Sequence, residues 1–163
     1  MSIRVAQTAL RVDAFEQIGA VPTVLAFSEL YGALRQGVVE AQENPLPTIA
    51  AANLNEVQEY LSLTGHFYNT VMMVMDTKVW DKISAEDQAI ILEEAEKMEK
   101  TVREENSATE ADTIQHLKDA GMKVNDDVDT AAFRKAMLPV YDKWGKDVFG
   151  TEMMDVYRAA SGW

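Results

Sequence analysis

Cysteine is absent from this 163-residue chain, and the absence removes several classes of chemistry. Without a thiol the protein has no disulfide framework, no thiolate nucleophile and no cysteine-based metal site. This composition fits an oxidising compartment without establishing one. The sequence also lacks a nucleophile elbow, a phosphate loop and a dinucleotide-binding fingerprint. It therefore offers no catalytic residue, and we expect neither an enzyme nor a bound cofactor.

Basic residues are scarce as well. The chain has 15 Lys and Arg against 27 Asp and Glu, a net charge of -12. Nucleic-acid backbones and anionic membrane surfaces are bound through clustered Lys and Arg, so we expect neither as a partner. The longest apolar run, residues 71–75, is far too short to span a membrane. Met1 leads straight into an apolar segment without the pattern of a secretory signal, which suggests a fragment.

What the chain does contain is enough apolar sequence for a core, 47% of its residues. Its length suits one domain or two small lobes. Only 10 of the 42 charged residues lie in positions 1–75, so the later part is much richer in charge. We expect a division into an α/β ligand-binding lobe at residues 1–67 and a helix-rich part at residues 68–163.

Short apolar segments alternate with helical patterns in the first part. This alternation predicts an α/β fold with a mostly parallel sheet, whose second strand is covered on both faces. Glycines at 19 and 37 end the first two helices. We predict strands at residues 3–6, 22–26 and 38–41, helices at 13–19, 29–36 and 48–60, and a turn or extended segment at 63–67.

The second part reads as mostly helical. Residues 68–75 carry no charge and predict a strand, and Ser84 then opens a helix that continues to Ala120, with Gly121 as its terminator. A short strand is predicted at 122–124. Asp129 or Thr130 caps a further helix, in which Pro139 predicts a kink or break. The last helix is predicted at 152–160.

Polar and aromatic side chains follow the predicted strands. Phe27 comes directly after the second strand, Asn44 follows the third, and Arg4 lies in the first. Ligands of open α/β sheets bind in the crevice outside the carboxyl ends of strands. The pattern predicts a small-molecule cleft with Arg4 as its positive charge. Each residue also has a plainer reading: a solvated or structurally paired arginine, a core aromatic, and a turn residue before Pro45.

Two other groups of polar residues favour structural roles. His66 and His116 are too far apart for a local metal motif. The aspartates at 126, 127 and 129 lack the glycine and distal glutamate of a calcium loop, so a turn and a helix cap are the better interpretation. We therefore expect no metal site.

Several motifs match a known family. The chain resembles the solute-binding proteins of TRAP transporters, the DctP-like family, along nearly its whole length. Its most specific motifs are AFSE at residues 26–29 and QENP at 42–45. The resemblance also covers residues 3–5 (IRV), 19–23 (GAVPT), 33–39 (ALRQGVV), 57–61 (VQEYL), Leu63, Thr64, His66, Trp80, 120–121 (AG), Phe133 and 139–141 (PVY).

The resemblance implies a periplasmic protein with two α/β lobes around a hinge. Such a protein closes on a small organic acid and delivers it to the membrane permease subunits of the transporter. This chain resembles only the C-terminal portion of the family. Residues 68–75 would then cross the hinge, and the long helix and the C-terminal helices would form part of the other lobe. Two departures from the family pattern are Ala6-Gln7, where a proline is frequent, and Glu40-Ala41, in place of Asp-Gly.

By position in the motifs, Arg4 would pair with the ligand carboxylate, Phe27 would pack on the ligand and Asn44 would hydrogen-bond it. Supporting roles fall to Gln7, Gln42, Glu43 and His66, with Glu43 orienting Arg4 or a loop. An alternative is a folded fragment that no longer binds solute and covers its apolar surface by self-association, for instance as a helix-swapped homodimer.

Overall fold

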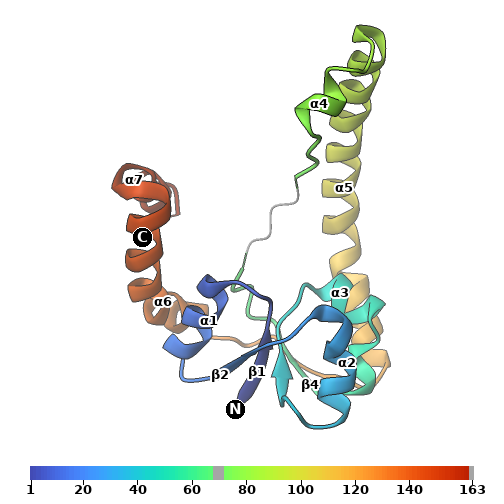
Figure 1. Ribbon diagram of the computed structural model, residues 1–163. Helices are drawn as coiled ribbons and strands as arrows, with labels where there is room; N and C mark the ends of the chain where they lie inside the picture. Colours follow the sequence, from blue (N-terminus) through green and yellow to red (C-terminus); the bar gives the residue numbers. More distant parts are fainter. Residues whose placement is uncertain (68–71, 162–163) are drawn as a thin grey trace.

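The computed structural model describes residues 1–67 and 72–161, in which two helical extensions leave an α/β body (Figure 1). One extension is a long helix that rises from the body, and the other is the C-terminal pair of helices. The elements in chain order are β1 (Ser2–Val5), α1 (Ala9–Gln17), β2 (Val21–Val24), α2 (Phe27–Arg35), β3 (Ala41–Gln42), α3 (Leu46–Ala51), η1 (Leu54–Glu56), β4 (Tyr60–Ser62), α4 (Thr77–Trp80), α5 (Ala85–Asp119), β5 (Lys123–Asn125), α6 (Thr130–Trp144), η2 (Gly145–Phe149) and α7 (Gly150–Ser161).

The first sheet is parallel throughout, as the alternation of strands and helices predicts. Its order is β2-β1-β3, and Arg4 of β1 lies opposite Thr23 and Gln42. The central strand β1 is buried, and Ile3 and Val5 pack with Phe15 of α1. The prediction that the second strand is covered on both faces was wrong. As an edge strand, β2 leaves Val21 61% and Val24 44% exposed.

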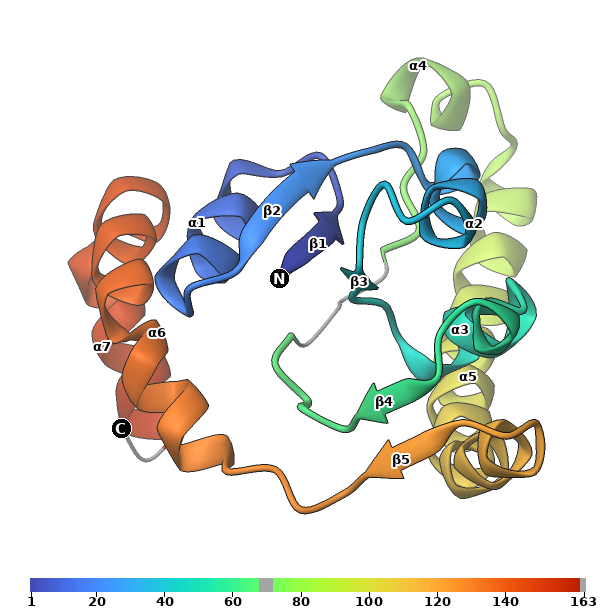
Figure 2. The same ribbon diagram turned by 90° about the horizontal axis from the view of Figure 1, so that it is seen from below.

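A second sheet joins distant parts of the chain, because β4 pairs in parallel with β5 (Figure 2). Around it lies the larger core, in which Leu117 and Met122 from the end of α5 pack with side chains of the first 61 residues. The C-terminal end of α5 and β5 therefore belong to the same packed body as β1–β3. The other buried members of this core are Leu30, Ala33, Leu34, Val39, Ile49, Leu54 and Leu61.

The helix predicted at 48–60 is broken. Helix α3 ends at Ala51, and Asn53 has φ of 51°, a left-handed conformation that asparagine tolerates but a helix cannot contain. The chain then turns through η1 into β4, which the sequence did not reveal. The third strand is also shorter than predicted, since only Ala41 and Gln42 pair with β1.

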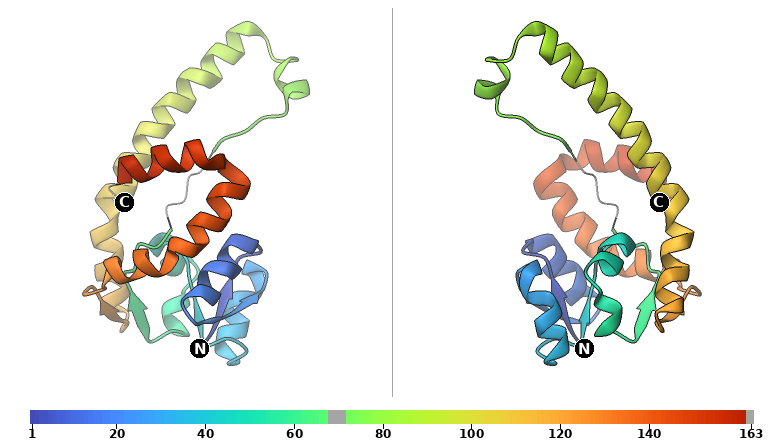
Figure 3. Two further views of the ribbon diagram at one scale, coloured as in Figure 1. Left: turned by 90° about the vertical axis from the view of Figure 1, so that its left-hand side faces the viewer. Right: turned by 90° about the vertical axis from the view of Figure 1, so that its right-hand side faces the viewer.

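Helix α5 follows the predicted boundaries closely. The Ser84 hydroxyl accepts a hydrogen bond from the backbone N–H of Asp87 at 3.1 Å, and Gly121 after the helix has φ of 98°. Between residues 72 and 116 no side chain is buried. This part of the helix projects from the body together with α4 (Figure 3). Of the helices that the structure describes, none combines the length and apolarity that a membrane span requires.

The predicted strand at 68–75 is not seen as such. Residues 68–71 lie outside the described residues, and residues 72–75 belong to no helix or strand. Their side chains are exposed, Val74 by 83%. An apolar segment with this composition needs a neighbouring strand to pair with.

Helix α6 lies against α1. Asp129 caps α6 by accepting a hydrogen bond from the N–H of Ala132 at 2.9 Å, as predicted. Of the kink or break predicted at Pro139, the break is absent, since α6 continues to Trp144 and the irregular turn η2 follows only there. A proline removes one backbone hydrogen bond of a helix, and α6 contains Pro139 without ending there. The carboxylate of Asp13 in α1 accepts hydrogen bonds from Lys143 at 2.5 Å and Trp144 at 2.7 Å.

Candidate functional site

Arg4 is the least exposed charged residue of the described protein, at 4%. Its position in the middle strand places it near the carboxyl end of the sheet, where β1 gives way to the loop before α1. Burial lowers the pKa of Arg4, while the negative charge of Glu43 raises it and the positive charge of Arg11 lowers it. Because an arginine keeps its proton in proteins, this site holds a fixed positive charge.

The surroundings of Arg4 hold only one side of its guanidinium. Its Nε donates a hydrogen bond to the carbonyl of Leu25 at 3.0 Å, directly after β2. The two terminal nitrogens bond no acceptor among residues 1–67 and 72–161. The guanidinium carbon lies 5.8 Å from the centre of the Phe27 ring, at the outer range of a cation–π contact. Phe27 itself is 47% exposed, so it is not a core aromatic.

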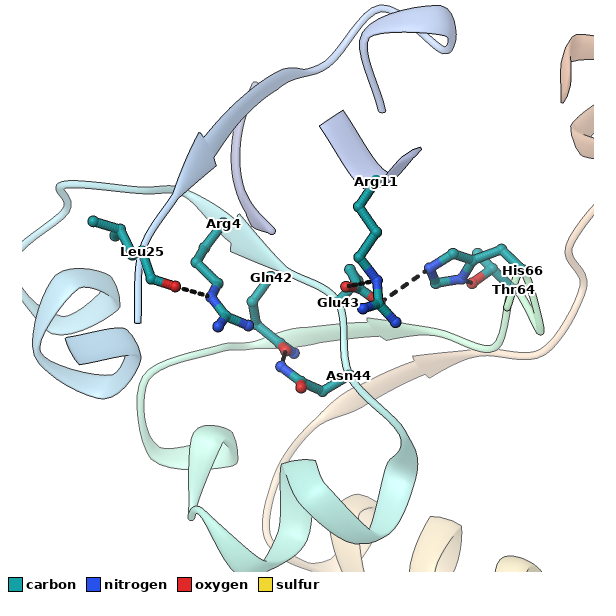
Figure 4. Close-up of polar contacts among 8 residues, drawn as sticks. All are labelled: Arg4, Arg11, Leu25, Gln42, Glu43, Asn44, Thr64 and His66. Atoms are coloured by element: carbon teal, nitrogen blue, oxygen red, sulfur yellow. Dashed lines mark hydrogen bonds and ion pairs between the residues drawn. The ribbon is translucent and has the colours of Figure 1, made fainter. Parts of the chain in front are cut away.

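Two amides at the end of β3, Gln42 and Asn44, complete this group (Figure 4). Gln42 is the register partner of Arg4, so their side chains leave the same face of the sheet. The Nδ2 group of Asn44 donates a hydrogen bond to Oε1 of Gln42 at 2.6 Å. Both amides are partly buried. The structure thus brings three predicted residues, Arg4, Phe27 and Asn44, to one edge of the sheet, with Gln42 among them.

Glu43 contacts a different arginine from the one we expected. Its carboxylate, 8% exposed, pairs with Nε of Arg11 at 3.0 Å and lies 3.5 Å from Nε2 of His66. It acts on Arg4 through its charge alone, and no ion pair between them occurs in the described part of the chain. Of the two roles expected for Glu43, orienting Arg4 or a loop, the described contacts fit the second, because the carboxylate reaches Arg11 and His66 and not Arg4.

His66 is held by its neighbours. Its Nδ1 lies 2.6 Å from the Thr64 hydroxyl, and its ring packs edge-on against Phe15 with the ring centres 5.6 Å apart. Arg11, in turn, stacks on Phe67 at 4.9 Å. Arg11 is the member of this cluster that the sequence did not reveal, since no local motif links a residue of α1 to the end of β3.

The remaining candidates lie elsewhere. Gln7 is exposed in the bend between β1 and α1. Over the described ranges, 1–67 and 72–161, no three acidic or histidine side chains come together as a metal site would require, and Asp129 acts as a helix cap. Two surface hollows lie away from Arg4. One lies between α1 and α6, and the other is an apolar groove between residues 73–80 and α5.

The chemistry of the Arg4 edge suits an anion. Two unbonded guanidinium nitrogens offer parallel N–H groups to a carboxylate, which accepts such a pair with two oxygens. The adjacent ring supplies an apolar surface, and the amides supply hydrogen bonds. We find no base or nucleophile in this group, whose members are an arginine, an aromatic ring and two amides.

Known proteins share both the sequence and the fold. Residues 1–147 match the family described as bacterial extracellular solute-binding protein, family 7. The 2,3-diketo-L-gulonate-binding periplasmic protein YiaO of Escherichia coli is 32% identical over 149 residues, which are 91% of this chain and 45% of that protein. The sialic acid-binding periplasmic protein SiaP of Vibrio cholerae is 32% identical over 148 residues, 91% of this chain and 46% of that protein.

A solved structure adds the same result for the fold. A TRAP periplasmic solute-binding protein from a Polaromonas species, bound to D-erythronate, superimposes with a TM-score of 0.89 at 37% identity, covering 96% of this chain and 51% of that one. The α/β fold with parallel strands and the resemblance seen in the sequence are thereby confirmed. The chain spans about half the length of these relatives. On the family match and the shared fold together, this chain belongs to the solute-binding proteins of TRAP transporters.

Proposed function

We propose that this chain is the carboxylate-binding part of a periplasmic TRAP solute-binding protein, which delivers a small organic acid to membrane permease subunits and catalyses no reaction. Arg4 pairs with the carboxylate, Phe27 packs against the ligand and Asn44 donates a hydrogen bond to it. The observation that carries the proposal is the buried guanidinium of Arg4, whose terminal nitrogens bond no described residue.

Burial of a charge without a partner is unfavourable, so this arrangement needs a reason. The Leu25 carbonyl satisfies Nε and fixes the plane of the guanidinium, which leaves the two other nitrogens directed at a common partner. A carboxylate fits both at once. Relatives are named as binding acids of this kind: 2,3-diketo-L-gulonate, sialic acid and D-erythronate.

Calorimetric titration of the protein with a panel of sugar acids and dicarboxylates tests the proposal. Arg4→Lys keeps the positive charge but removes the two parallel N–H groups of the guanidinium. We therefore expect the affinity for any acid that the wild type binds to fall by about tenfold or more. Arg35→Lys is the matched control, because Arg35 is exposed at the end of α2. The affinity of this variant for the acid should equal that of the wild type. No hit in the panel, or equal binding by Arg4→Lys, would contradict the proposal.

We also propose that residues 72–75 and the projecting part of α5 belong to the other lobe, which the chain enters after residue 67, while the end of α5 and β5 return to the lobe that begins at residue 1. The support is an apolar surface left open on the described chain. Its groove is lined by Met73, Val74, Met75, Thr77, Trp80, Ile91, Leu92 and Ala95. The relatives are about twice as long as the region they share with this chain, which provides the chain length to cover it.

The same surface favours a second candidate, a fragment that associates with another copy of itself. Light scattering over a range of concentrations separates the two. A protein that stays monomeric contradicts self-association. A dimer that Met73→Glu dissociates would favour self-association over covering of the groove by the other lobe.

A further inference from the structure

We propose that Gln42 is a positioning residue for the ligand, which acts by fixing the direction of the Asn44 amide. The inference rests on the proposed carboxylate site and adds to it a residue that does not itself bind the acid. Its basis is the 2.6 Å hydrogen bond from Nδ2 of Asn44 to Oε1 of Gln42, beside the buried Arg4.

An asparagine at an anion site must present the correct end. The two ends of its amide have nearly the same shape and opposite roles, since the nitrogen donates and the oxygen accepts. Turned by 180°, Asn44 would place an oxygen where a carboxylate needs a donor. The surroundings of Asn44 therefore decide whether it attracts or repels the acid.

The hydrogen bond with Gln42 fixes which end of the Asn44 amide faces the ligand. Oε1 of Gln42 faces Asn44 and can only accept a hydrogen bond, so the contact forms with the nitrogen of Asn44 and is lost when the Asn44 amide alone turns. Nδ2 carries a second N–H, which bonds no acceptor within the described residues and stays available to a ligand. Figure 4 shows the amide of Gln42 between the Arg4 guanidinium and the Asn44 amide.

The register of the sheet explains why residue 42 can do this. Gln42 is the last residue of β3 and the partner of Arg4 in β1, so its side chain starts from a rigid, paired position. Asn44 lies two residues later, in the loop before Pro45, where the backbone forms no ladder. A side chain anchored in the sheet thus steadies one that is carried by a loop.

The test is a double-mutant cycle on affinity for an acid that the wild type binds. Gln42→Met keeps the length of the side chain and removes the acceptor, and we expect the affinity to fall about fivefold to tenfold. In the Asn44→Ala background the same change should have no further effect, because a positioning residue acts only through its partner. Gln36→Met, at the exposed end of α2, is the control and should bind like the wild type.

A second readout is independent of the ligand. In the ¹⁵N–¹H spectrum of the ligand-free protein, the two side-chain N–H signals of Asn44 should be well separated and should move to free-amide positions in Gln42→Met. The inference would be overturned if Gln42→Met lowered the affinity equally in the wild-type and Asn44→Ala backgrounds, or did not lower it at all. The proposal of carboxylate binding would survive either result. A wild type that binds no acid overturns the proposed function, and this inference with it.

Discussion

The body and the projecting arm of this molecule are held together in different ways. In the body, residues from β1 to β4 and from the end of α5 bury a common apolar core. In the arm, residues 72–116, no side chain is buried, and helix α5 is supported by pairs along its own surface. Lys97 bonds Glu93 at 2.7 Å and Glu94 at 2.8 Å, and Arg103 bonds Glu99 at 2.9 Å.

This difference shows where the fold of the isolated chain is complete. Burial contributes kilocalories for each large side chain, whereas an exposed pair on a helix contributes a few tenths. The body has what a stable domain needs, and the arm has an apolar groove that no part of the described chain covers. We infer that the arm is the part that most depends on a further partner.

One helix allows the comparison to be made with a single kind of substitution. Leu117 and Leu92 both lie in α5, but Leu117 is fully buried and Leu92 is 57% exposed. Leu117→Ala should lower the free energy of unfolding by about 2–5 kcal/mol. Leu92→Ala should change it by no more than about 0.5 kcal/mol. Urea unfolding measures both, and similar losses from the two would mean that the arm is covered in solution.

Charged residues should behave oppositely in the two regions. Replacing Arg4 by Met removes a buried charge whose terminal nitrogens lack partners, so the free energy of unfolding should stay equal or rise by about 1 kcal/mol, while acid binding is lost. Arg103→Met in the arm removes only an exposed ion pair and should lower stability slightly. Thermal unfolding without ligand gives the answer. A large loss from Arg4→Met would show that Arg4 is a structural residue.

The sequence predicted the Arg4 edge for a reason that is local. Alternating strands and helices fix which strand ends meet, so Arg4, Phe27 and Asn44 could be placed together without knowledge of the core. The ends of α5 were equally clear, since Ser84 and Gly121 mark them. Signals carried by a few neighbouring residues were therefore read correctly.

What could not be predicted depends on residues far apart in the chain. Strand β4 is three residues long and forms because β5 lies beside it, with Tyr60 opposite Lys123. The contact of Glu43 with Arg11 depends on how α1 packs on the sheet. Neither has a local pattern. The break at Asn53 was missed for another reason, because its left-handed conformation is only one of several that asparagine tolerates.

The contact between α1 and α6 should make the free energy of unfolding depend on pH. Hydrogen bonds from Lys143 and Trp144 lower the pKa of Asp13. A lowered pKa means that the carboxylate stabilises the fold above the pKa of the unfolded state, about 3.9, and that this contribution is lost as the pH falls below it. Unfolding followed from pH 6 to 2 should therefore show a smaller acid loss in Asp13→Asn than in the wild type. Glu16→Gln, on the same helix, should keep the wild-type profile.

The smallest effect is expected in the arm itself. The hydrogen bonds that Lys97 donates to Glu93 and Glu94 raise its pKa, and Lys97 stays charged at neutral pH. Because these partners are exposed, salt screens them, and Lys97→Ala should reduce helicity slightly at low salt and not at all at 1 M salt. Circular dichroism at the two salt concentrations measures this. A salt-independent loss would mean that Lys97 contacts something other than its two glutamates, and hence that the arm is packed against a partner after all.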